Sequence, residues 1–164
     1  MPISEQDKQR LQKYLESKGL PPLGSAANLK SKPSEEQDGM PDILGLIVDS
    51  LYTQTLQNSS EIAAKNEKEL EAFKSKLAIQ IFNQALVLAA EDQSNFDRYL
   101  VDELTESESF EEIIFKVGIY IQGFPEFAYK FVVYTIATYI LYCLEYKMVP
   151  SERILSIYSV YLNN

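Results

Sequence analysis

The sequence contains no histidine and no tryptophan, and Cys143 is its only cysteine. Histidine is the commonest acid–base catalyst and metal ligand among side chains, so its absence excludes a Ser-His-Asp triad, a Cys-His pair and a zinc site within this chain. A single cysteine cannot form an intramolecular disulfide. Because Cys143 lies among apolar residues, we predict a buried structural thiol rather than a reactive one.

Sequence motifs for nucleotide binding and hydrolysis are also absent. The chain has no G-x-G-x-x-G, no Walker A and no G-x-S-x-G pattern. It also lacks the EF-hand spacing of oxygen ligands that calcium requires. We therefore predict that the protein is not an enzyme, that it has no catalytic or metal-binding residues, and that it needs no cofactor.

Positive charge is scarce. The chain has 15 Lys and Arg residues against 24 Asp and Glu residues, a formal net charge of −9 at pH 7. This surplus repels nucleic acid and anionic membranes, so neither is expected as a partner. The first residues, MPISEQDKQR, are polar and lack the apolar core of an export signal. With the single cysteine, this predicts a reducing, intracellular compartment, and we expect a cytoplasmic protein.

The longest apolar stretch lies between Pro125 and Met148, and it has no charged residue between Lys130 and Glu145. Proline suits the first turn of a helix, and Pro150 stops the helix from continuing. The β-branched residues of the stretch also suit a buried pair of strands, although no turn residue interrupts it. A membrane span needs about 20 predominantly apolar residues, so the shorter uncharged run favours a core helix.

Apolar residues recur at helical spacing in the flanking segments, and no segment alternates with the period of a strand. These patterns predict an all-α, single-domain bundle of six or seven helices around a central apolar helix at about 125–148. The distribution of proline and glycine divides the chain into an N-terminal helical arm (1–20), a flexible Pro/Gly-rich loop (21–41) and a helical core domain (42–164).

Capping residues predict where several helices begin and end. Gly19 suits the left-handed cap of the first helix. Residues 58–60 are candidates to cap a long helix that follows them. Ser109 and Glu112 form a capping box ahead of another helix, and residues 123–125 form a tight turn into the central helix.

Negative charge is concentrated in one segment. Residues 91–112 hold nine acidic residues and one base, Arg98, so they carry −8 of the total −9. Four interpretations are open: a solvated face with acids at helix N-termini, a binding surface for a basic partner, a cation site of oxygen ligands, and a carboxylate pair for acid–base chemistry. Helix dipoles account only for acids in first helical turns. The acids without such a local reason are the candidate partner-binding residues, Asp102, Glu103, Glu106 and Glu108.

These features favour a small intracellular helical protein that acts by protein–protein interaction, as an adaptor, a subunit of an assembly, a chaperone-like protein or an inhibitor. The expected partner is a protein, with a basic surface as the favoured chemistry. Two alternatives stay open: a carrier of a small apolar ligand within the bundle, and conditional membrane insertion of the hydrophobic hairpin 113–144. The chain is expected to hold no stable membrane span.

Overall fold

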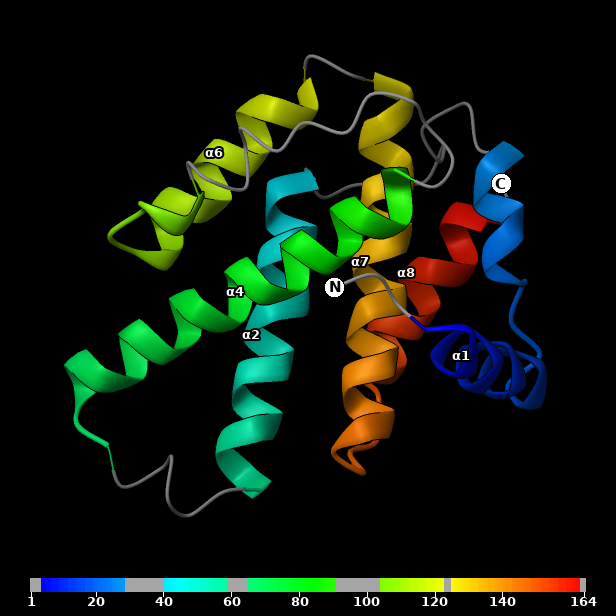
Figure 1. Cartoon of the computed structure of the whole chain (residues 1–164), viewed down its shortest axis with the longest axis horizontal. Coiled ribbons are helices and arrows are strands. Elements are labelled where there is room, and N and C mark those ends of the chain that lie inside the picture. Colours follow the sequence, from blue (N-terminus) through cyan, green and yellow to red (C-terminus); the bar gives the residue numbers. More distant parts are fainter. Residues whose placement is uncertain (1–3, 29–39, 59–64, 91–103, 123–124, 163–164) are drawn as a thin grey trace.

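The computed structural model describes residues 4–28, 40–58, 65–90, 104–122 and 125–162 (Figure 1). These residues form six α-helices and one 3₁₀ helix, and none of them lies in a β-strand. The prediction of an all-α, single-domain bundle is therefore confirmed. The elements are α1 (Glu5–Ser17), η1 (Leu23–Asn28), α2 (Met40–Asn58), α4 (Glu67–Ala90), α6 (Phe110–Gln122), α7 (Pro125–Glu145) and α8 (Glu152–Leu162).

Helix α7 lies at the centre of the bundle and packs against α1, η1, α2, α4, α6 and α8 (Figure 1). Every residue from Phe131 to Ile140 is buried, whichever side of the helix it lies on. The hydroxyls of Thr135 and Thr138 donate hydrogen bonds to the carbonyl oxygens of Phe131 and Tyr134, at 2.7 and 2.9 Å. These local bonds satisfy both hydroxyls inside the core. The alternative interpretation of this stretch as a buried strand pair is wrong.

Helix α7 ends without the glycine that usually closes a helix. Glu145 is its last residue, and the Met148 N–H donates to the Cys143 carbonyl oxygen at 2.8 Å, which closes the final turn. Lys147 adopts a φ of 56°, in the left-handed region that favours glycine. The predicted central helix is confirmed, with residues 146–148 forming its cap.

Helix α1 ends in the same geometry, with a glycine in the left-handed position. At its start the Ser4 Oγ accepts a hydrogen bond from the Asp7 N–H at 3.1 Å. At its end Gly19 has a φ of 67°, and the Leu20 N–H donates to the Leu15 carbonyl oxygen at 2.9 Å. A residue with a Cβ is strained in this conformation, so glycine stabilises the cap. The prediction for Gly19 is confirmed.

Helix α1 and η1 belong to the same core as α7. Leu11, Leu15 and Ala26 are buried in one cluster with residues of α2, α4, α7 and α8. Tyr158 of α8 donates its hydroxyl hydrogen to the Pro21 carbonyl oxygen at 2.7 Å. The structure thus places residues 4–28 against α7 and α8, and the division into arm, loop and core domain stays a prediction.

Helix α4 begins later than the sequence predicted. The Asn66 Oδ1 accepts a hydrogen bond from the Glu69 N–H at 2.8 Å, which makes Asn66 the N-cap and Glu67 the first helical residue. The expected cap at residues 58–60 is therefore wrong for this helix. An asparagine side chain competes well for the first free N–H groups of a helix, and Asn66 is the nearest such residue to the helical segment.

A buried tyrosine joins α7 to α2 and to the connection before α8. The Tyr139 hydroxyl donates to Gln54 Oε1 at 2.6 Å and accepts from the Ser151 N–H at 2.8 Å. Gln54 in turn donates through Nε2 to the Val149 carbonyl oxygen. Burial raises the pKa of Tyr139 above its usual value, because an ionised phenolate would lose its hydration, so the hydroxyl stays neutral in the fold.

Among the residues that the structure describes, no helix is long and apolar enough to cross a bilayer. The hairpin 113–144 consists of parts of α6 and α7, and its turn at residues 123–124 lies outside the described residues. Conditional insertion of that hairpin into a membrane stays a prediction.

Candidate protein-binding surface

Two of the four predicted partner-binding residues lie in the described part of the chain. Glu106 and Glu108 are both exposed, in the short connection between Leu104 and α6. Asp102 and Glu103 lie outside the described residues. From residue 104 to residue 112 the sequence has four acidic residues and no base, so negative charge gathers where α6 begins.

Part of this charge stabilises the N-terminal end of α6. The Ser109 Oγ accepts from the Glu112 N–H at 3.2 Å, and Glu112 Oε2 accepts from the Glu108 N–H at 2.9 Å. The Glu112 carboxylate also pairs with Lys116 Nζ at 3.2 Å. The backbone N–H of Glu108 and the charge of Lys116 lower the pKa of Glu112. The predicted cap at Ser109 is confirmed, and the return bond of the capping box is shifted by one residue, because Glu112 accepts from the Glu108 N–H instead of the Ser109 N–H.

A groove of about 490 Å³ lies between α2 and α6, and we call it the α2/α6 groove. Asp42 and Asp49 line it from α2, and Glu111 lines it from α6. Gly45 has no heavy atom within 4 Å of the place where a Cβ would stand, which leaves the α2 side of the groove open. The groove combines apolar and acidic side chains, and its lining residues are Asp42, Gly45, Leu46, Asp49, Phe110, Glu111, Ile114 and Arg153.

The charges of the α2/α6 groove are only partly matched within the protein. Lys74 of α4 forms an ion pair with Asp49. Arg153 brings one further positive charge to the lining. The lining also holds Asp42 and Glu111, and the exposed acids Glu106 and Glu108 lie close to Glu111 in sequence. The surface around the groove therefore carries a surplus of negative charge.

Two large apolar side chains of α6 point away from the core. Phe115 is 66% exposed and Ile119 is 55% exposed. They lie one helical turn apart, and Glu111 lies one turn before Phe115, so the three residues share one side of the helix. On the opposite side Ile113 and Val117 are fully buried. We call Glu111, Phe115 and Ile119 the outer face of α6.

The sequence prediction included the acids near this surface and missed its apolar part. Phe115 and Ile119 lie outside the apolar row that contains Ile113 and Val117, and this spacing was the available signal. A helix whose apolar residues extend beyond one row has either further neighbours in the fold or an exposed apolar side. For α6 the structure shows the second case at Phe115 and Ile119.

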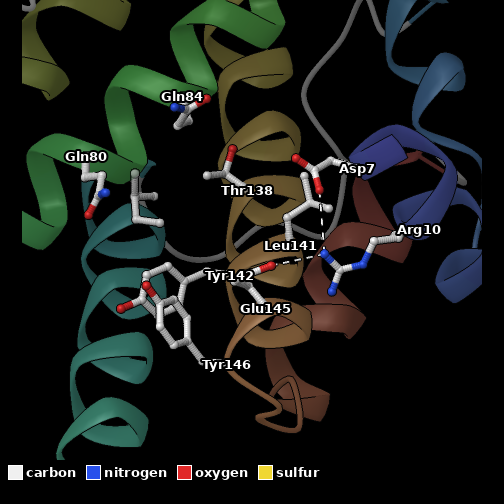
Figure 2. Close-up of a pocket in the computed structure, with 10 residues that line it drawn as sticks. Asp7, Arg10, Gln80, Gln84, Thr138, Leu141, Tyr142, Glu145 and Tyr146 are labelled. Carbon is white, nitrogen blue, oxygen red and sulfur yellow. Dashed lines mark hydrogen bonds and ion pairs between the residues drawn. The ribbon is translucent and has the colours of Figure 1, made fainter. Parts of the chain in front are cut away.

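A second pocket, of about 400 Å³, lies between α1, α4 and α7 (Figure 2). Figure 2 shows Arg10 of α1 between two carboxylates: its Nη1 lies 3.1 Å from Glu145 Oε2 and 3.6 Å from Asp7 Oδ1. The Arg10 guanidinium thus offsets part of the charge of the two acids, and its pair with Glu145 ties α1 to the end of α7. The lining is mixed in polarity, with Gln80, Gln84, Thr138, Leu141, Tyr142 and Tyr146 among its residues. A role as a carrier of a small apolar ligand stays a prediction.

Within the described ranges, no group of three or more cysteine and acidic side chains is arranged to hold a metal ion. Comparisons with protein-family models, with curated proteins and with solved structures gave no match. The class of the protein is therefore defined by its fold, an all-α helical bundle. Its function has to be argued from the α2/α6 groove, the outer face of α6 and the acidic residues beside them.

Proposed function

We propose that this chain acts by binding a protein partner with a basic surface, through the acidic segment at the start of α6. The partner-binding residues are Asp102, Glu103, Glu106 and Glu108. The observation that supports the proposal is the surplus of exposed carboxylates near the α2/α6 groove, where residues 104–112 contain no base. Like charges gathered on one surface repel one another, so a partner of opposite charge relieves a cost that the isolated chain bears.

Complementary charge acts mainly on the association rate and on the choice of partner. At about 0.1 M ionic strength the screening length is about 10 Å, so attraction between exposed charges fades as salt is added. The same charge disfavours nucleic acid and anionic membranes as partners. We place the protein among cytoplasmic adaptors, assembly subunits, chaperone-like proteins and inhibitors rather than among enzymes, because its sequence has no histidine and no catalytic motif.

The test compares association rates of wild type and a neutralised variant. A partner is isolated on the wild-type chain at low salt, and its association is then followed with the variant D102N/E103Q/E106Q/E108Q. We expect association at low salt to slow by about tenfold or more, and its dependence on salt to become flatter. The free energy of unfolding should stay within about 0.5 kcal/mol of wild type, because Glu106 and Glu108 are exposed and the variant removes charges that repel one another.

Two smaller variants separate the local effect from that of net charge. Glu106→Gln with Glu108→Gln changes the acidic segment, and Glu5→Gln with Glu16→Gln changes two exposed acids of α1 by the same total charge. We expect only the first pair to slow association substantially. If the partner associates with the fully neutralised variant at the wild-type rate in low salt, the proposal is wrong.

A further inference from the structure

The outer face of α6 adds an apolar component to the acidic surface. Phe115 and Ile119 are more than half exposed, at 66% and 55%, although burying a large apolar side chain stabilises a fold or a contact. Among the described residues three other large apolar side chains are exposed, but they lie elsewhere: Tyr146 just after α7, Val149 before α8 and Val160 on α8. Single exposed apolar residues are ordinary, whereas two on one turn of one helix form a small patch.

The patch adjoins the α2/α6 groove. Ile114 lines the groove and is the neighbour of Phe115 in sequence, and Glu111 belongs to both the groove and the outer face. The groove and the outer face of α6 therefore share Glu111, and each of them presents apolar side chains of α6. A segment that binds here has to present apolar side chains to this surface and positive charge to the acids at the N-terminal end of α6.

Charge decides among the possible occupants. A second copy of this chain, related by a twofold axis, would bring two copies of the same acidic surface together, in a chain of net charge −9. An anionic lipid surface and nucleic acid meet the same repulsion. Among the described residues there is no strand, so there is no sheet edge to which an extended peptide could add. An apolar helix face packed along α6 and its groove matches the exposed side chains, because Phe115 and Ile119 lie one helical turn apart beside the groove.

We propose that the outer face of α6 and the α2/α6 groove bind an amphipathic helix of the partner. Apolar side chains of that helix pack on Phe115 and Ile119 and enter the groove beside Ile114 and Leu46. Its lysine or arginine side chains meet Glu111 and the acids before α6. The inference rests on the proposed function, because the basic character of the partner comes from there.

The experiment selects helical peptides from a displayed library on the full-length chain and measures their dissociation constants by fluorescence anisotropy. The selected peptides should combine apolar residues at helical spacing with an excess of lysine and arginine. We expect the variant F115S/I119S to weaken their binding by about tenfold or more, the size of a loss at a well-packed contact. The control Val160→Ser, an exposed apolar residue of α8, should bind as wild type does. Thermal unfolding of both variants verifies that the fold is intact.

The outcomes separate this inference from the proposed function. If E106Q/E108Q weakens binding and F115S/I119S does not, the helix-binding face is wrong and the acidic binding surface stands. If F115S/I119S weakens binding and the acid variants do not, the basic character of the partner is wrong, and the proposed function is overturned with it. If neither E106Q/E108Q nor F115S/I119S changes the dissociation constants of the peptides, both the proposed function and the helix-binding face are wrong. The mass of the free chain is also measured at several concentrations. If the chain self-associates and F115S/I119S abolishes the self-association, the outer face of α6 binds a second copy of this chain, and the inference is wrong.

Discussion

Helices α6 and α7 are both strongly apolar and follow one another in the chain, yet they are buried to very different extents. From Phe131 to Ile140, α7 has no exposed residue. Helix α6 buries Ile113 and Val117 and leaves Phe115 and Ile119 largely exposed. Apolar composition alone therefore does not determine whether a side chain is buried in this protein.

The difference follows from the number of elements around each helix. Helix α7 lies at the centre of the bundle and packs against α1, η1, α2, α4, α6 and α8 (Figure 1). Helix α6 packs mainly against α2, α4 and α7, and it lies at the periphery of the bundle (Figure 1). Within the described part of the chain, one side of α6 therefore has few neighbours, and Phe115 and Ile119 are exposed on it.

The largest expected effect compares one aliphatic side chain of α7 with one aromatic side chain of α6. Ile140→Ala should lower the free energy of unfolding by about 2–5 kcal/mol, because Ile140 is fully buried and the deletion leaves a cavity. Phe115→Ala should change it by less than about 0.5 kcal/mol, since Phe115 is largely exposed. Urea unfolding followed by circular dichroism measures both values.

Ile136→Ala provides a second buried test in α7, with the same expected range. A loss below about 0.5 kcal/mol for Ile140 and Ile136 would place that side of α7 on the surface and remove the contrast between the two helices. A large loss for Phe115→Ala would mean that its ring packs within the fold, and the outer face of α6 would then be unavailable to a partner.

A smaller effect is expected from single hydrogen-bonding groups on the two helices. Tyr139→Phe removes the hydroxyl that binds Gln54 and the Ser151 N–H, and it should cost about 1–3 kcal/mol because both partners are left unsatisfied. Ser109→Ala removes the cap of α6 and should cost about 1 kcal/mol. Thermal unfolding ranks the two variants. A larger loss for Ser109→Ala than for Tyr139→Phe would contradict the assignment of α7 as the more tightly integrated helix.

The smallest expected effect has the opposite sign and concerns the end of α7. Lys147→Gly should stabilise the protein by about 0.5–1 kcal/mol, because Lys147 has a φ of 56° and glycine adopts this conformation without strain. The matched change at the end of α1, Gly19→Ala, should destabilise by a similar amount. Denaturant midpoints measure both. A destabilised K147G variant would show that the lysine side chain contributes more than the strain costs.

Local rules predicted much of the fold because they involve residues within about one turn of each other. The caps at Gly19 and at Ser109 with Glu112 depend on neighbours that the sequence displays directly. The prediction for the start of α4 used the same rules and was wrong, because more than one residue was suited to be the N-cap. Asn66 caps this helix, whereas the sequence predicted a cap at residues 58–60. The acidic composition near α6 was equally visible, since charge can be counted along the chain.

The sequence by itself determined an all-helical chain with a central apolar helix and a concentration of acid before α6. Only the tertiary structure decided which apolar side chains of α6 face solvent, and that α2 and α6 together form a groove with acids on both helices. It also brought Glu71 of α4 to the Phe110 N–H, across 39 residues of sequence. The physical reason is that helical periodicity specifies the relative direction of side chains on one helix, whereas burial depends on which other helices pack beside it.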